Sequence, residues 1–333
     1  MEIRKVQEMG GGTLLVSLPK KWVIQNKIEK GSIITFEEAE MGRLILLPER
    51  NTKKENKQAI IKYPVEYMEV LFNLITGNYL LGVDIIRIQG KNRIKYEDRE
   101  IIKKAIRNLI GLEILEESAN SIMSQFLIEP NSLDARKIIR RMQMISKGMC
   151  HDAIISTIES DEHLRKIVAE RDDEVDRLYF LLVRLIRSAA QDSVLASRFG
   201  MSQIDCLDFR VAANLIEGIG DVSIEIANES ANIQPQEIDD EIKKLLTKTL
   251  EMLDEILEIS MNRFLDQGEN SVIKLKNNIE ELDKVLNQIK TDATSKNRKS
   301  NRALLEISLS IDKVAGYCRD LSDLTGPSTI INN

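Results

Sequence analysis

Aromatic residues, histidine and cysteine are all scarce in this chain. Phe, Trp and Tyr make up 4% of the 333 residues, and there are two histidines and three cysteines. Cys150, Cys206 and Cys318 stand far apart and form no CxxC pair, so neither a disulfide framework nor a zinc site is indicated. We expect all three to be buried small apolar residues. Few aromatics beside many Ile and Leu favour helical bundles over a sandwich or barrel.

Long apolar runs and an amino-terminal signal peptide are also absent. The longest uncharged, mostly apolar run, Val70–Val83, is too short to span a bilayer. We therefore expect a cytoplasmic protein without membrane insertion. The net charge of −6 and the isoelectric point near 5.4 argue against a protein that coats nucleic acid with its whole surface. Any DNA binding must be local.

Residues 1–50 differ in pattern from the rest of the chain. Four short β-prone runs are separated by glycine-containing turns: Ile3–Gln7, Thr13–Leu18, Ser32–Phe36 and Leu44–Leu47. Between the second and third run, Lys20–Asn26 has room for a short helix behind Pro19. A unit of this size buries too little surface to be stable alone, so we expect a homodimer.

Four features of this segment occur in a characteristic order. They are Arg4-Lys5-Val6 in the first strand, the glycine turn at Gly10–Gly12, the Thr13–Pro19 strand that ends in Leu-Pro-Lys, and the Ile28–Ser32 step before the third strand. In this order they resemble the AbrB/SpoVT family of swapped-hairpin DNA-binding domains. The resemblance implies that residues 1–50 bind DNA and dimerise by interleaving their strands.

Basic residues outnumber acidic ones in this segment. Up to Ile34 there are six Lys or Arg and three Glu. Such cations can contact the phosphates of a duplex, and the DNA-binding candidates are Arg4, Lys5, Lys20 and Lys21. The alternative is that these side chains only solvate an ordinary surface.

Residues 57–130 predict a small α/β (α+β) domain behind a charged linker, Glu49–Lys57. Strands are expected at Gln58–Tyr63, Asp84–Gln89, Leu112–Glu116 and Met123–Ile128, and helices at Pro64–Leu81 and Tyr96–Ile110. The segment has no Walker motif and no dinucleotide fingerprint. A structural coupler is therefore favoured over an effector pocket.

The remaining residues predict an all-α region with an internal repeat. Six helices are expected: Ser132–Ile158, Asp161–Ala190, Ser202–Ser230, Pro235–Leu265, Ser271–Lys290 and Ser300–Leu324. They form two sets of three, 131–232 and 233–326, which is typical of a duplicated three-helix bundle. In the third helix we expect one apolar stripe, formed by Val211, Leu215, Ile219, Val222 and Ile226.

Two acidic pairs lie at helical spacing in the first set. Asp172 and Asp176 share one face of the second helix, and Glu217 and Asp221 share one face of the third. If these faces adjoin, four carboxylates converge, and hard oxygen ligands suit a divalent or trivalent cation. The alternative is a solvated acidic face. Gly218 and Gly220 lie inside the same helix, which indicates either a close helix contact or room for a ligand.

The run Ile216–Ala227, IEGIGDVSIEIA, resembles the L-E-R-I-G-D-H-A-x-N-I-A motif of the PhoU family, whose members are tandem three-helix bundles with E/D-x3-D motifs. The resemblance implies that Asp172, Asp176, Glu217 and Asp221 bind metal, with iron or zinc expected and magnesium possible. Gly218 and Val222 depart from the motif.

In the second bundle, Lys276 and Ser308 stand at two acidic positions of the repeat, so a second metal cluster is not indicated. An AbrB-like domain ahead of a PhoU-like region also resembles an archaeal arrangement of phosphate-uptake regulators.

These features predict a dimeric regulator of phosphate uptake or phosphate-responsive transcription. Its expected partners are DNA and a phosphate ABC transporter component or sensor kinase. An alternative is an adaptor whose first domain only dimerises. A di-iron carboxylate enzyme would need Glu-x-x-His pairs, whereas His151 and His163 are preceded three residues earlier by Gly148 and Ser160. We expect no enzyme.

Overall fold

The computed structural model describes residues 3–39, 42–48, 56–129, 132–192, 195–196, 199–266, 271–296 and 299–324. Its contacts divide the chain into two units, Met1–Asn56 and Lys57–Asn333. The finer division into domains 1–50, 57–130, 131–232 and 233–326 stays a prediction. Most of the predicted linker Glu49–Lys57 lies outside the described residues.

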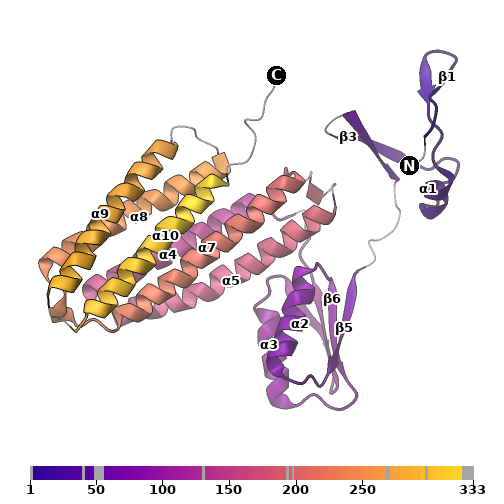
Figure 1. The fold of residues 1–333 in the computed structure, drawn as a ribbon. Coiled ribbons are helices and arrows are strands. Elements are labelled where there is room, and N and C mark those ends of the chain that lie inside the picture. Colours follow the sequence, from indigo (N-terminus) through magenta and orange to yellow (C-terminus); the bar gives the residue numbers. More distant parts are fainter. Residues whose placement is uncertain are drawn as a thin grey trace. The chain divides into compact units, whose positions relative to one another are not determined.

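The first unit contains two β-hairpins and one short helix (Figure 1). Strand β1 (Gln7–Met9) pairs with β2 (Thr13–Leu15), and β3 (Ile34–Ala39) pairs with β4 (Arg43–Pro48), both antiparallel. Helix α1 (Lys20–Gln25) lies between them in sequence.

The predicted first strand, Ile3–Gln7, is wrong. Gln7 pairs with Leu15, where β2 ends, so the residues before Gln7 have no opposite strand. The second predicted strand, Thr13–Leu18, also ends early, at Leu15. The chain must leave the hairpin there to reach α1.

The described part of this unit buries none of its large apolar side chains fully. An isolated two-stranded hairpin is marginally stable in water, and more strands or a packed face are needed for independent stability. These side chains are therefore available to a partner surface. The large apolar residues that are exposed are Ile3, Val6, Met9, Leu14, Leu15, Val16, Ile24, Ile33, Phe36 and Leu44.

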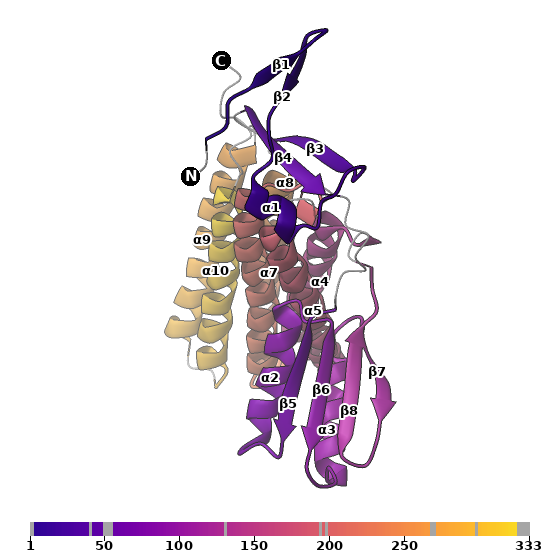
Figure 2. The same cartoon turned by 90° about the vertical axis from the view of Figure 1, so that its right-hand side faces the viewer.

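The second unit begins with a four-stranded sheet covered by two helices (Figure 2). Its elements are β5 (Gln58–Tyr63), α2 (Met68–Leu80), β6 (Ile85–Gly90), α3 (Tyr96–Arg107), β7 (Leu112–Glu117) and β8 (Ser121–Phe126). The strand order is β5-β6-β8-β7, with β5 parallel to β6 and the other pairs antiparallel. The expected order of elements is confirmed.

Two boundaries in this sheet and its helices differ from the sequence-based expectation. The helix expected from Pro64 begins at Met68, because extended backbone at Tyr67 still carries the chain from the sheet to the helix layer. Strand β8 begins at Ser121, two residues before the expected Met123. The tight β7–β8 connection sets that start, since the amide of Ser118 already donates to the carbonyl of Ser121.

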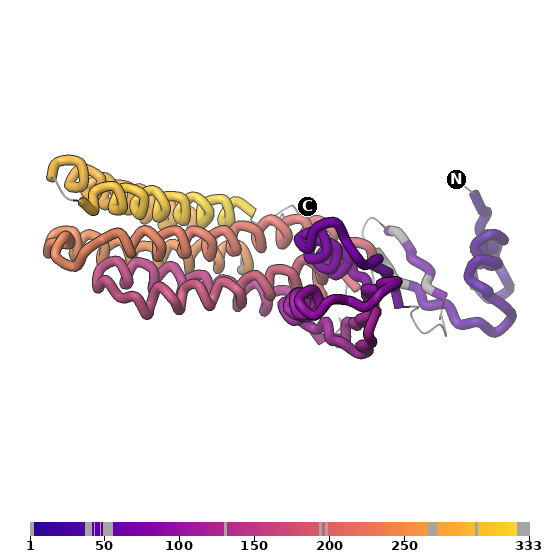
Figure 3. The backbone as a smooth tube through the Cα atoms, turned by 90° about the horizontal axis from the view of Figure 1, so that it is seen from below, coloured from indigo at the N-terminus to yellow at the C-terminus, as the bar shows by residue number. Residues whose placement is uncertain are grey.

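In the described residues, six long helices follow the sheet: α4 (Ala135–Glu159), α5 (Glu162–Gln191), α7 (Gln203–Ser230), α8 (Asp240–Asp266), α9 (Ser271–Ser295) and α10 (Asn301–Asp323). Figure 3 shows α8, α9 and α10 running beside α4, α5 and α7. No helix in the described ranges combines the length and the apolar character that a membrane span requires.

Side-chain caps determine several of the helix starts. Asp161 accepts hydrogen bonds from the amides of His163 and Leu164 at the start of α5. Ser202 and Asp205 form a reciprocal capping box at the start of α7. The helix expected from Pro235 is instead a short 3-10 turn, η3 (Pro235–Glu237), followed by α8 from Asp240.

The buried stripe of α7 differs in part from the expected one. Ile219, Val222 and Ile226 are buried as expected, but Val211 is 46% exposed. The prediction for Val211 is wrong because α7 packs against α4, α5 and α10, and this arrangement turns the neighbours of Val211 inward instead. Those neighbours include Phe209, Ala212 and Ala213, which are buried.

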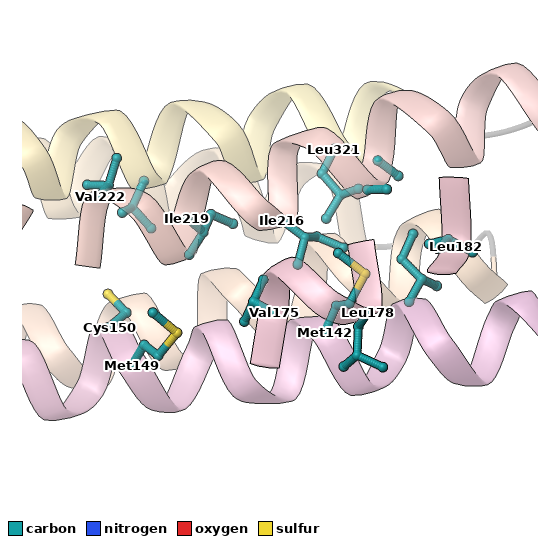
Figure 4. Packing of buried hydrophobic residues seen from close by; sticks show 14 of the residues in the cluster. Met142, Met149, Cys150, Val175, Leu178, Leu182, Ile216, Ile219, Val222 and Leu321 are labelled. Atoms are coloured by element: carbon teal, nitrogen blue, oxygen red, sulfur yellow. The ribbon is translucent and has the colours of Figure 1, made fainter. Parts of the chain in front are cut away.

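Residues of both helical sets contribute to one hydrophobic core. Figure 4 shows Val175 and Leu178 of α5, Ile216 of α7 and Leu321 of α10 among the side chains of this core. The three cysteines are free and buried, as expected. Burial raises the pKa of the Cys150 and Cys318 thiols to about 12.

Arg184 joins the helical region to the sheet. This α5 residue is 4% exposed, and its guanidinium donates to the carbonyls of Tyr79 (2.7 Å) and Val83 (2.9 Å). It also forms an ion pair with Asp84 at 3.3 Å. The other carboxylate oxygen of Asp84 accepts from the backbone amide of Lys57 at 2.9 Å. Arg184 therefore fixes the residues just before β6. Through Asp84 it also fixes Lys57, which precedes β5.

We expect Arg184→Met to lower the free energy of unfolding by roughly 3 kcal/mol, because it leaves buried acceptors without a donor. Arg187→Met, on an exposed turn of the same helix, should change it by about 0.5 kcal/mol or less. Urea unfolding of the two variants measures the difference. Equal decreases in the free energy of unfolding would show that the buried guanidinium of Arg184 contributes no more to stability than the exposed one of Arg187.

Candidate acidic site

The two acidic pairs belong to one electrostatic cluster. Asp172 and Asp176 lie on α5, and Glu217 and Asp221 lie on the adjoining α7. Burial, together with the negative charges of Asp176 and Asp221, raises the pKa of Asp172 to about 6. The structure thus places acids from both helices close enough to repel each other, as the sequence predicted.

Glu217 on α7 also has a strongly raised pKa. Burial and the charges of Asp221, Asp176 and Asp172 together raise it to about 7, against the opposing effect of Arg210. The Arg210 guanidinium lies 5.1 Å from the centre of the Tyr179 ring. The acids of the cluster outnumber the cations Arg210 and Lys313 that oppose the rise in their pKa values.

The other two acids follow the same trend. The pKa of Asp176 is raised by burial and then by Asp221. The pKa of Asp221 is raised by burial and by Glu225, and Lys313 of α10 opposes the rise. The cluster is therefore half-buried on the α5 side and reaches solvent at Asp221, which is exposed.

The two glycines of α7 have different neighbours. A Cβ atom at Gly218 would lie 3.0 Å from the Tyr317 ring of α10, so this glycine allows a close helix contact. A Cβ atom at Gly220 would lie 3.6 Å from Oδ1 of Asp172 and 3.7 Å from Oγ of Ser146, which is ordinary contact. Gly218 therefore allows a close contact between α7 and α10, and Gly220 lies next to the acidic cluster.

Ser146 on α4 is a neighbour of the cluster that the sequence reading missed. It is 1% exposed, and its hydroxyl finds no hydrogen-bond partner among the described residues. A buried hydroxyl without a partner costs free energy, which a ligand or water between α4, α5 and α7 would recover. A serine inside a long amphipathic helix gives no sequence signal of such a position.

Carboxylate and hydroxyl oxygens are suitable donors for a hard cation. As the side chains stand, however, no three or more His, Cys, Asp or Glu residues in the described ranges are arranged to hold a metal ion. The acids would have to turn toward one another to coordinate one. Metal binding stays a prediction.

The corresponding positions of the second bundle lack this acidic character. Lys276 is exposed and forms an ion pair with Glu280 at 3.8 Å. Ser308 is buried, and its hydroxyl donates to the carbonyl of Leu304 at 2.7 Å. These positions therefore bring no second group of four acids together.

The four DNA-binding candidates are all exposed in the first unit. Lys20 and Lys21 form the first turn of α1, whereas Arg4 and Lys5 precede β1 and are not part of a strand. Their expected place in the first strand is wrong. DNA contact by these residues is untested and stays a prediction.

Comparison with known proteins identifies the segment that holds the acidic cluster. Residues 139–230 match the family model described as the PhoU domain. The matched segment includes most of α4 and all of α5 and α7, and therefore all four acids.

The chain is also similar to a curated protein. The phosphate-specific transport system accessory protein PhoU homolog of Aquifex aeolicus (strain VF5) is 32% identical over 133 residues, which is 38% of this chain and 60% of the relative. The chain thus spans less than two thirds of that relative's length.

Two solved structures are also similar. The phosphate transport system regulatory protein PhoU from Streptococcus pneumoniae has a TM-score of 0.48 and 12% identity, covering 57% of this chain and 91% of that one. PhoU from Pseudomonas aeruginosa has a TM-score of 0.41 and 11% identity, covering 57% of this chain and 93% of that one.

The raised pKa values predict how stability depends on pH. Folding raises the pKa of Glu217 from 4.5 to about 7, so its contribution to stability is full below pH 4.5 and is lost as the pH rises to about 7. We expect the melting temperature in chelator to fall less between pH 5 and pH 8 in Glu217→Gln than in the unsubstituted protein. Glu306→Gln, at an exposed position of α10, should leave the fall unchanged. Equal falls in all three proteins would contradict the raised pKa.

Proposed function

We propose that this protein regulates phosphate transport as an adaptor, through contacts that its helical region makes with a phosphate ABC transporter component or a sensor kinase. The observation that supports this most is the match of residues 139–230 to the PhoU domain. The name of the Aquifex aeolicus relative points the same way. The protein would act in the cytoplasm and would have no catalytic role.

The acidic cluster would hold a divalent or trivalent cation. Two features support this: four carboxylates raise one another's pKa, and the Ser146 hydroxyl beside them has no partner in the described structure. A bound cation would supply positive charge that relieves the repulsion between α5 and α7. Iron or zinc is the first expectation from the family resemblance, and magnesium is possible.

Elemental analysis tests the metal proposal with a matched pair of double variants. Asp176→Asn with Asp221→Asn removes one acid from each helix of the cluster. Glu280→Gln with Asp312→Asn removes the acids at the corresponding positions of the second bundle. We expect the first variant to lose most of the bound metal and the second to keep it. Undiminished metal in the first variant would exclude these ligands.

A second function, DNA binding, is favoured by the exposed surface of the first unit. Arg4, Lys5, Lys20 and Lys21 are all exposed, and the same unit leaves its apolar side chains without a core. A homodimer that interleaves two such units would cover the apolar side chains and double the number of cations. Phosphate contacts from those cations would give affinity that weakens with salt.

Binding of the intact protein to duplex DNA at several salt concentrations tests this second function. We expect Lys20→Ala with Lys21→Ala to weaken binding at least tenfold and to reduce the salt dependence. Lys243→Ala with Lys244→Ala, near the start of α8, serves as the control and should bind like the unsubstituted protein. No binding to any duplex at low salt would leave the adaptor function alone.

A further inference from the structure

The outer side of α2 is apolar and exposed. Among its 13 residues Glu69 is the one charged residue. Tyr67, Val70, Leu74 and Leu81 are between 40% and 61% exposed. Their spacing of three, four and seven residues places them on one side of the helix. An exposed apolar strip of this length marks an interaction surface.

Strand β5, which contacts α2, is an open edge of the sheet (Figure 2). It pairs with β6 on one side, and Ile60 in its middle is 65% exposed. The opposite edge, β7, has an irregular register between Ile114 and Glu116 and several acidic side chains, features that block edge pairing. The β5 edge has no such irregularity.

We propose that β5 and the outer side of α2 pair with the same surface of a second copy of this chain. The pairing is around a twofold axis that passes near Ile60 and Leu74. Helix α2 follows β5 and leads back to the start of the parallel strand β6, so it runs opposite to β5. One axis through the middle of both elements then makes both antiparallel to their copies. Tyr67 and Leu81, seven residues on either side of Leu74, meet each other's copies.

The charges at the two ends of this surface favour a second copy as the occupant. Glu66 and Glu69 lie at the end where α2 begins. Lys57 lies at the other end, where its carbonyl accepts from the amides of Asp84 and Ile85. Twofold pairing brings the acidic end of one copy to the Lys57 end of the other. All three residues are exposed in the described structure, so their charges are accessible to a second copy.

Disulfide formation in the intact protein tests the pairing. Residues at a twofold axis face their own copies, and a disulfide requires Cα atoms about 4.4–6.8 Å apart. We expect Ile60→Cys and Leu74→Cys to form covalent dimers under mild oxidation at least ten times faster than Ile101→Cys. Ile101 is an exposed residue of α3 away from this surface. The three native cysteines are buried and should not interfere.

A second variant separates this pairing from a dimer formed by the first unit, so the result does not depend on the proposed function. Adding Leu74→Glu to Ile60→Cys should slow cross-linking at least tenfold, because two carboxylates would meet at the axis. A protein that sediments as a dimer, but in which Ile60→Cys and Leu74→Cys react no faster than Ile101→Cys, would overturn the proposal. That result would leave dimerisation by residues 1–50 intact.

Discussion

The packing of α5 against α7 is the contact on which the acidic site depends. Burying one aliphatic side chain contributes about 1.5–3 kcal/mol, whereas a pair of like charges on a helix surface costs about 0.2–0.5 kcal/mol. Val175, Leu178, Ile216 and Ile219 are buried along these helices, so apolar packing outweighs the repulsion between the acids. The acids stay close together and partly buried because the surrounding apolar packing is stronger than their mutual repulsion.

Much of the fold could be predicted where local chemistry and packing agree. Asp161 and Ser202 have capping side chains that fix the starts of α5 and α7, and both helices begin within one residue of the expected position. Strand β5 has the expected limits because alternate residues face a real core. The ends of the strands in residues 1–50 were harder to predict, since the apolar side chains of these hairpins have no core to select a register.

Other features depend on contacts between distant residues, which no local pattern encodes. The meeting of Asp172 with Glu217 could be predicted from two acidic spacings, but the nearby Ser146 and Tyr317 could not. Arg184 gave a weak signal, as a lone cation within the apolar run of α5. Its partners Tyr79, Val83 and Asp84 lie about 100 residues earlier, so the buried ion pair could not be predicted from that run.

The close approach of Gly218 to the Tyr317 ring links the two sets of three helices. The two bundles share one apolar interior, in which α7 of the first packs against α10 of the second. Separating the two bundles would expose to water the apolar side of α7 that α10 covers beside the acidic cluster. We therefore expect the six helices to unfold together as one cooperative unit.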